Sequence, residues 1–302
     1  MAVRETVGRV EIPLEDSLPG PARWRRMGRL IRHNPLGFLG LIIILALVVV
    51  GVFAPWIAPY GEGEIVAAPS QDPSLGHLFG TDGSGRDMFS RVVFGARISL
   101  IVAFASVVGG TLLATAVGIF SGYVGGWMDG VIQRSVDTVI AFPALLLLLI
   151  IVQVLGPSMQ NVIFAVGLGI IPGITRVVRG AVLSERNNQY VEAARALGAS
   201  TPRILFVHIA PNVTALAVVI MTTLLGTAIL AEASLSFLGL GIPAPNPSWG
   251  TDISEARKHF PIHFWWAFFP GLAISLTVLG FNLLGDTIRD VLDPRLRGRG
   301  TA

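Results

Sequence analysis

The residues of this chain that could carry out chemistry are few and scattered. His259 and His263 lie four apart, a spacing that can place two zinc ligands on one face of a helix. Pro261 stands between them and no glutamate accompanies them, so we expect no metal site there. Asp82 and Asp87 flank a glycine-rich segment, but this segment lacks the number of oxygen ligands that a calcium loop needs. We expect it to form a turn.

The sequence also contains no pattern typical of a serine nucleophile or of a phosphate-binding ATPase loop. Ser84 lies between two glycines, but the five-residue pattern of a hydrolase nucleophile is absent. A phosphate-binding ATPase loop ends in Lys-Ser or Lys-Thr, whereas the only lysine, Lys258, precedes a histidine. The absence of cysteine rules out disulfides and thiolate metal sites. The sequence therefore predicts a protein that is not an enzyme and that binds no metal or cofactor itself.

A stretch of small side chains, YVEAARALGAS, offers a different kind of site. It predicts a short helix from Tyr190 to Ser200, bordered by the charges of Glu192 and Arg195. Small residues let another surface approach the backbone closely, so this face could dock a soluble partner or could pack on the protein's own helices. The residues that we expect on one face are Ala193, Ala194, Leu197 and Gly198.

The residues that follow predict a compact projection. Gly198 is a good helix stop, and Thr201 and Pro202 are typical of the N-cap and first residue of a second short helix. We therefore expect a helix, a sharp turn and a second helix that leads into the next apolar segment.

The composition indicates which solvent these elements face. Hydrophobic residues make up 52% of the 302 residues, charged residues only 14%, and the mean hydropathy is +0.69, whereas soluble domains are about 25% charged. Backbone groups must be paired in lipid, so we predict an all-α integral membrane protein with six transmembrane helices. The apolar runs are Leu36 to Ile57, Ile98 to Ile119, Val131 to Leu155, Met159 to Ile174, Val213 to Leu238 and Phe264 to Leu284.

Two details of these runs matter for packing. The fourth run is short and glycine-rich, and we expect Pro172 to break it near its end. Gly118 and Gly122 have the spacing of close helix contacts, while Gly126, four residues on, is expected in a loop.

Three charged residues lie within or beside the runs and need an explanation, because a charge exposed to lipid costs at least about 2.5 kcal/mol. Arg134 and Asp137 are three residues apart, and we expect them to pair with each other. Glu232 could face a translocation path or could make a structural hydrogen bond to a neighbouring helix. The sequence leaves both interpretations of Glu232 open.

Basic residues predict the orientation. With both termini in the cytoplasm, 17 of the 22 basic residues fall inside, and Arg86, Arg91, Arg97, Arg257 and Lys258 fall outside. The segments 60–96 and 241–263 then face out, and 121–130 and 177–212 face in. The net charge of +3 does not indicate nucleic-acid binding, because the basic residues lie between apolar runs rather than along one face.

The same pattern divides the chain into four parts. Residues 1–33 are polar and proline-containing and are expected to form a cytoplasmic arm, and the first run is expected to stay uncleaved as a membrane helix. Residues 34–95 hold the first membrane helix and an extracytoplasmic loop. Residues 96–287 form the core of five membrane helices, with the predicted projection near 183–212, and residues 288–302 form a cytoplasmic tail.

Six stretches of the chain resemble one family of transport proteins. EAARALG and the following HIAPN resemble the cytoplasmic EAA loop of permease subunits of ATP-binding-cassette (ABC) importers. From Arg32 onward the chain resembles the C subunit of dipeptide and oligopeptide permeases, a binding-protein-dependent inner membrane component. The matching stretches are RHNPLGFLGL, GTDGSGRDMFSRVVFGARISL, AFPALLL, YVEAARALGAS, AEASLSFLGLGIPAPNPSWG and FNLLGDTIRDVLDPRLR.

The resemblance implies a Type I importer permease in a bacterial or archaeal cytoplasmic membrane. Its partners would be a second permease subunit, two ATPase subunits that bind ATP and Mg²⁺, and an extracytoplasmic binding protein. Glu192, Ala193, Ala194, Arg195 and Gly198 would form the surface that docks on an ATPase. Ala210 departs from the leucine that the wider loop pattern favours before the proline.

Two alternatives stay open. The chain could be a secondary transporter coupled to protons through Asp137 or Glu232, although no clear internal repeat supports this. It could also be an importer of the same architecture for nickel or sugars, because recognition of the substrate belongs largely to the binding protein in such systems.

Overall fold

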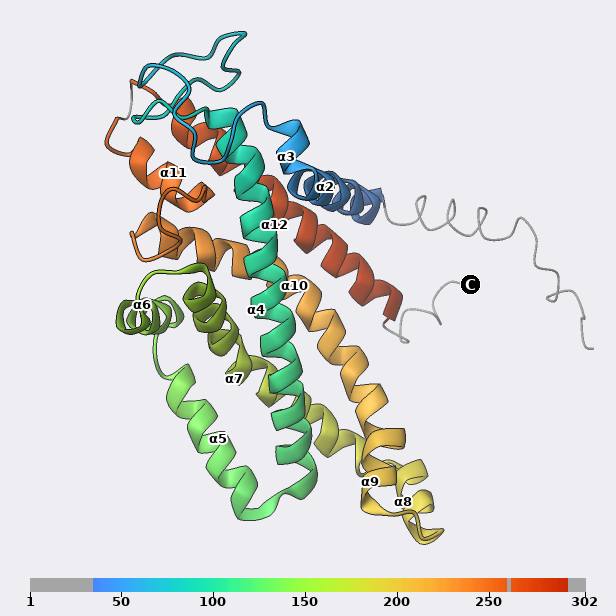
Figure 1. The fold of residues 1–302 in the computed structure, drawn as a ribbon. Coiled ribbons are helices and arrows are strands. Elements are labelled where there is room, and N and C mark those ends of the chain that lie inside the picture. The colour runs from blue at the N-terminus through green and yellow to red at the C-terminus, as the bar shows by residue number, and fades with distance from the viewer. Residues whose placement is uncertain (1–34, 260–261, 293–302) are drawn as a thin grey trace, which may run out of the picture. The chain divides into compact units, whose positions relative to one another are not determined.

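The computed structural model describes residues 35–259 and 262–292, so the predicted arm 1–33 and the end of the predicted tail lie outside the described residues. The fold of the described residues is helical (Figure 1). The helices are α2 (Pro35–Val52), α3 (Ala54–Ile57), α4 (Met88–Val124), α5 (Gly126–Ile140), α6 (Ala144–Leu155), α7 (Met159–Glu185), α8 (Gln189–Ala196), α9 (Thr201–Arg203), the π-helix η1 (Ile204–Ile209), α10 (Ala210–Phe237), α11 (Trp249–Ala256) and α12 (Trp265–Leu292).

Five of these segments are long and apolar enough to cross a membrane. They are α2, α4, α7, the continuous stretch Thr201–Phe237 and Trp265–Asp290 of α12. Four of the six predicted runs therefore fall on one continuous helix each, the first run holds α2 and the short α3, which are separated at Phe53, and the third run is interrupted.

The interrupted segment is the third predicted run, which is not one straight helix. It consists of α5 and α6, which are bent by 91° relative to each other, so it adds a sixth span only if the pair crosses the membrane together. The sequence at the bend explains the break. Pro143 has no N–H to donate and disfavours a helical conformation at Phe142, so α5 ends at Ile140 and α6 starts after the proline.

The expected break at Pro172 is wrong, because α7 continues through this residue to Glu185. Pro172 is buried, and α7 packs along α4 on both sides of it. A Cβ added to Gly110 of α4 would lie 2.7 Å from the carbonyl oxygen of Gly167, and one added to Gly118 would lie 2.9 Å from that of Thr175. Packing on both sides thus holds the helix despite one missing backbone hydrogen bond.

Glycines also set the distance between α4 and α7 further along. A Cβ at Gly122 would lie 3.0 Å from the carbonyl oxygen of Arg179. The predicted close contact at Gly118 and Gly122 is therefore confirmed. The expectation that Gly126 lies in a loop is wrong, because Gly125 alone separates α4 from α5 and Gly126, with a φ of +63°, is the first residue of α5. Helices α4 and α5 occupy most of the segment 121–130, which is expected to be an inner loop, because α4 ends at Val124 and α5 begins at Gly126.

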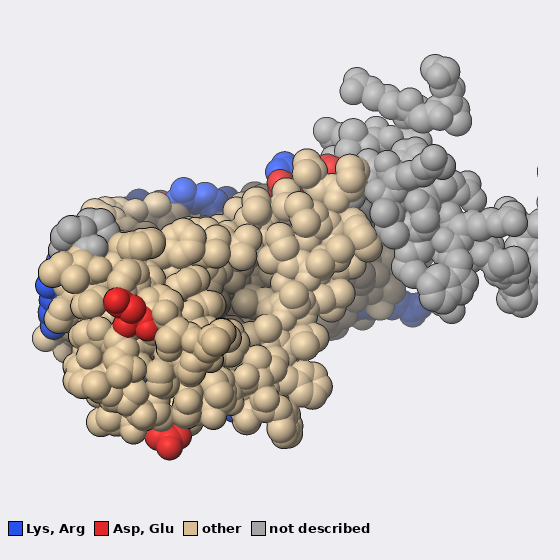
Figure 2. Space-filling model, turned by 90° about the horizontal axis from the view of Figure 1, so that it is seen from above, with Lys and Arg blue, Asp and Glu red and all other residues tan. Residues whose placement is uncertain are grey.

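The two ends of the helices carry different structures (Figure 1). The turn between α4 and α5 and the short helices α8 and α9 lie at one end. At the opposite end lie α11 and the loop between α3 and α4. Seen from that second end, the surface shows few charged side chains and is hollowed near its middle (Figure 2).

Candidate functional site

The predicted helix in YVEAARALGAS is α8, and it is anchored to the ends of the long helices by one buried side chain. Val191 is fully buried. It belongs to an apolar cluster with Val182 of α7, Ile204 and Ile209 of η1 and Val213 of α10. This cluster fixes one side of α8, so the opposite side is presented outward.

Tyr190 adds a polar attachment on the same loop. Its hydroxyl donates to Oε2 of Glu185, the last residue of α7, at 2.5 Å, and accepts a bond from Nδ2 of Asn212 in α10 at 3.1 Å. Asn188 also donates to Oε2 of Glu185, at 2.7 Å. Burial and the adjacent carboxylate raise the pKa of Tyr190, so the phenol keeps the proton that it donates.

Gly198 ends α8 in the left-handed conformation that the sequence predicts. Its φ is +80°. The N–H of Gly198 donates to the carbonyl of Arg195, and the N–H of Ala199 donates to that of Ala194, both at 3.0 Å. This pair of bonds is the Schellman motif, in which glycine avoids the steric penalty of a side chain. A Cβ at Gly198 would meet nothing within 4 Å, so the position faces open space.

The outward side of α8 combines small and charged residues. Glu192, Ala193 and Arg195 are exposed, Ala194 is half-buried, and Leu197 is 88% exposed. The five predicted docking residues thus lie on one projection, and four of them, all but Ala194, are exposed.

The second half of the projection differs from the prediction by one residue. Ser200, not Thr201, is the N-cap, and Thr201 and Pro202 are the first two residues of α9. The helix then runs without interruption through η1 into α10. π-helical turns are rare and are often found at functional sites. The predicted order of helix, turn and helix leading into the next span is confirmed.

The expected pair of Arg134 and Asp137 does not form. Asp137 pairs instead with Arg176 of α7, and both side chains are more than half exposed. Helix α7 lies beside α5 and offers a guanidinium from the facing helix, which the local spacing could not indicate. A second pair joins the same two helices, since Nη2 of Arg179 lies 2.6 Å from Oδ2 of Asp129. Arg134 itself is exposed.

Glu232 is fully buried near the end of α10, where three serine hydroxyls surround it. Its Oε1 accepts bonds from Ser236 and Ser248, both at 2.8 Å, and its Oε2 accepts one from Ser99 of α4 at 3.2 Å. Whether it takes part in transport stays a prediction. The hydrogen bonds join α10 to α4 and to the segment that leads into α11.

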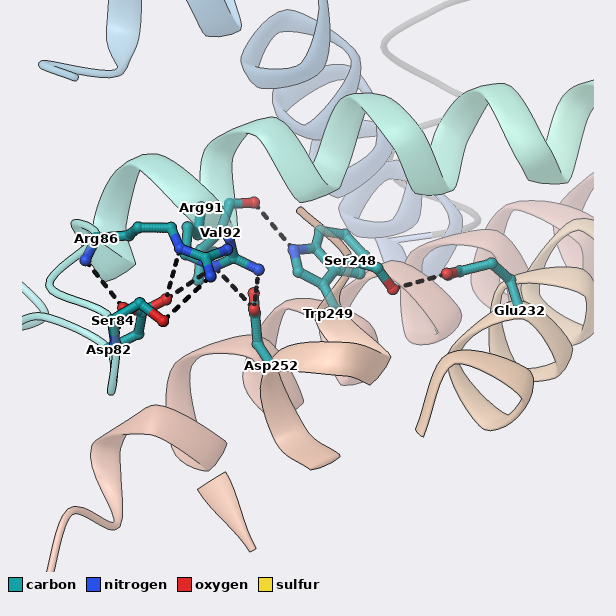
Figure 3. Close-up of polar contacts among 9 residues, drawn as sticks. All are labelled: Asp82, Ser84, Arg86, Arg91, Val92, Glu232, Ser248, Trp249 and Asp252. Carbon is teal, nitrogen blue, oxygen red and sulfur yellow. Dashed lines mark hydrogen bonds and ion pairs between the residues drawn. The ribbon is translucent and has the colours of Figure 1, made fainter. Parts of the chain in front are cut away.

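Sequence reasoning missed the ion pair beside this cluster. Arg91 of α4 donates to Oδ1 of Asp252 in α11 from Nε at 2.8 Å and from Nη2 at 2.5 Å (Figure 3). Both residues are buried and are separated by 161 positions. Trp249 of α11 donates from its indole to the carbonyl of Val92 at 2.9 Å. No local signal marked these residues as partners.

The glycine-rich segment around Ser84 is a turn, as expected. Oδ1 of Asp82 accepts the N–H groups of Ser84 and Arg86, at 2.8 and 2.9 Å. Asp87 is the N-cap of α4, and its Oδ2 accepts the N–H of Ser90 at 2.8 Å. Both carboxylates therefore have structural roles in the start of α4.

The two histidines that could have suggested a metal site lie against an aromatic residue. His263 stacks on Trp266 with ring centroids 5.0 Å apart, and His259 meets the same ring at 4.9 Å. Among residues 35–259 and 262–292, no three acidic, histidine or cysteine side chains are grouped so that they could hold a metal ion.

Comparison with known proteins identifies the family. Residues 114–298 match the model of the binding-protein-dependent transport system inner membrane component, and residues 22–73 match that of the N-terminal transmembrane domain of oligopeptide transport permease C. The chain is 43% identical over 288 residues to a dipeptide transport system permease protein of Alkalihalophilus pseudofirmus, covering 94% of each chain.

A second relative gives the same result. The chain is 44% identical over 277 residues to a glutathione transport system permease protein of Escherichia coli, covering 91% of each chain. The expected resemblance is therefore confirmed, and so is the helical membrane fold. The chain belongs to the family of binding-protein-dependent transport system inner membrane components and is a multi-pass membrane protein of the inner-membrane type.

Proposed function

We propose that this chain is the permease subunit of an ATP-driven importer of dipeptides or oligopeptides. It would form the translocation path with a second permease subunit, receive substrate from an extracytoplasmic binding protein and depend on two ATPase subunits for energy. The observation that carries this proposal is the outward face of α8. This face is exposed and consists of small and charged side chains. The side chains of Val191 and Tyr190 attach α8 to the start of α10.

The role of the projection follows from its attachment. Because α9, η1 and α10 form one continuous helix, a displacement of the projection is transmitted directly to a membrane span. An ATPase seated on Glu192, Ala193, Ala194, Arg195 and Gly198 would therefore move the transport path when it binds or hydrolyses ATP. ATP and Mg²⁺ would be bound by that partner.

The peptide substrate rests on the relatives. One is a permease protein for dipeptide transport and the other for glutathione transport, and both align along nearly the whole chain. This favours peptides over nickel or sugars. The relatives also favour an importer over a proton-coupled transporter, and the buried hydroxyl shell of Glu232 explains that residue without proton transfer.

Purification of the tagged chain, co-expressed with the second permease and the ATPases, tests the proposal. We expect the ATPases to be retained and to hydrolyse ATP, and we expect the complex in vesicles to take up a labelled dipeptide only with ATP. The chain purified alone should hydrolyse none. Uptake by vesicles that contain this chain without ATPases, driven by a proton gradient, would contradict the proposal and support the secondary transporter.

Cysteine labelling tests the orientation that the arginine distribution predicts. The chain has no native cysteine, and Leu75 and Ser200 are both exposed, on loops at opposite ends of the helices. In intact cells, an impermeant maleimide should label a Leu75→Cys variant and should label Ser200→Cys only after the cells are opened. Labelling of Ser200→Cys from outside would reverse the predicted orientation.

A further inference from the structure

Helix α11 is fastened to α4 by polar contacts that are buried at the end of the molecule opposite α8 (Figures 1 and 3). The guanidinium of Arg91 makes two bonds to Asp252, and the Trp249 indole donates to the carbonyl of Val92. Gly95 of α4 makes room for this indole, because a Cβ there would lie 2.6 Å from Trp249 Nε1. These contacts fix both the position and the rotation of α11 against α4.

The same short helix is fastened to α10. Ser248, the N-cap of α11, donates to Oε1 of Glu232 at 2.8 Å. Gly250 lies directly on the backbone of α10, where an added Cβ would come within 2.2 Å of the carbonyl oxygen of Ala233. Helix α11 therefore joins α4 to α10, and α10 is continuous with the projection at the other end.

We propose that Arg91 is a positioning residue for transport. Through Asp252 it holds α11 between α4 and α10, so that the extracytoplasmic surface and the span that carries the coupling loop change position together. This inference rests on the proposed function. According to this inference, the buried pair couples the docking of a loaded binding protein to the ATPases.

The chemistry of the pair makes a test available, because buried Asp82, whose Oδ2 lies 3.9 Å from Arg91 Nε, keeps Arg86 as a partner at 3.4 Å when Arg91 is replaced. Removing only Arg91 or only Asp252 leaves a buried charge without its partner and should impair folding, whereas replacing both by apolar residues of similar size is often tolerated. The double variant Arg91→Met with Asp252→Leu should therefore assemble with the second permease and the ATPases. It should lose the directional bonds that orient α11.

The experiment uses the whole complex in nanodiscs with its binding protein and a dipeptide. We expect the double variant to keep the basal rate of ATP hydrolysis and to lose about fivefold or more of the stimulation by the loaded binding protein, the usual size of a coupling between sites. Arg91→Lys, which keeps the charge without the planar fork, should recover part of the stimulation. Arg97→Gln is the control, because Arg97 also lies on α4 but its side chain is exposed.

A distance measurement shows whether α11 has moved. Spin labels on cysteines at the exposed positions Arg97, on α4, and Lys258, just after α11, should give a narrow distance distribution in the parent and a broader one in the double variant. Full stimulation of an assembled double variant, or an unchanged distribution, would overturn the inference.

If the double variant does not assemble, a milder variant tests the inference. Ser248→Ala removes one hydroxyl donor of Glu232 and should lower the stimulation by about threefold, the scale of a single hydrogen bond. Stimulation equal to that of the parent would then overturn the inference. A parent complex whose ATPases do not respond to the binding protein would instead contradict the proposed function itself.

Discussion

Replacing Gly198 with leucine is expected to stop peptide uptake while the protein still reaches the membrane. Two effects act at this residue. A non-glycine residue in the left-handed conformation, with φ at +80°, costs about 1–2 kcal/mol. The new side chain also projects into open space on the outward side of the loop, where nothing of this chain lies within 4 Å.

The second effect should dominate. If an ATPase covers this surface, four extra carbon atoms overfill the contact, and overfilling costs about 1–3 kcal/mol, or roughly 5–150-fold in affinity. The ATPases should then be lost during purification of the variant, and uptake should fall by a similar factor. A cysteine at Ala194 should crosslink to the ATPase in the parent and much less in the Gly198→Leu background.

Gly239 provides a matched control for the free-energy cost of placing a non-glycine residue in the left-handed conformation. It has a φ of +83°, an added Cβ meets nothing within 4 Å, and it ends α10 with the same two hydrogen bonds, from Gly239 to Ser236 and from Leu240 to Leu235. It lies at the opposite end of α10 from the projection. Gly239→Leu should therefore carry the same backbone penalty but retain the ATPases. Equal retention in the Gly198 and Gly239 variants, with normal uptake, would show that the outward face of α8 is not the docking surface.

The features of the site that could be predicted from the sequence are those determined by residues close to one another in the chain. Gly198 ends α8 because a left-handed residue is needed after the last turn, and glycine is the residue that adopts this conformation without strain. The spacing of Gly118 and Gly122 likewise indicates one face of a helix, and this face packs on α7. Such features are set within a few residues and are visible in a single sequence.

The two prolines show where local reasoning stops. Pro143 and Pro172 lie in similar apolar surroundings, yet α5 and α6 separate at the first while α7 continues through the second. The difference comes from α4, which contacts α7 before and after Pro172 and holds both halves in line. Only the packing of a helix distant in sequence decides between a break and a tolerated proline.

Ion pairs depend even more on the tertiary arrangement. Arg134 has the right spacing for Asp137 on one helix, but a partner on α7, 39 residues away, takes its place. Arg91 and Asp252 are 161 residues apart, and each looks like an ordinary surface charge in a predicted loop. Their burial against each other follows from how α11 is inserted between α4 and α10, which no periodicity in the sequence encodes.

Two neighbouring glycines of α4 give the most direct test of this packing. Gly110 is buried against α7, where an added Cβ would lie 2.7 Å from the carbonyl oxygen of Gly167, whereas Gly109 is exposed and an added Cβ meets nothing within 4 Å. Leucine at either position removes a glycine from a helix interior, which by itself favours the helix by about 0.5–1 kcal/mol.

Only the Gly110→Leu variant forces the two helices apart, because the atom that it meets belongs to the backbone and cannot rotate away. Overpacking of this kind costs about 1–3 kcal/mol even where side chains can adjust, so we expect more here. In detergent, Gly110→Leu should lower the thermal midpoint of the purified chain and its yield, while Gly109→Leu should match the parent or exceed it slightly. Equal midpoints for the two variants would mean that α4 and α7 do not approach each other this closely in the membrane, and the continuity of α7 through Pro172 would then need another cause.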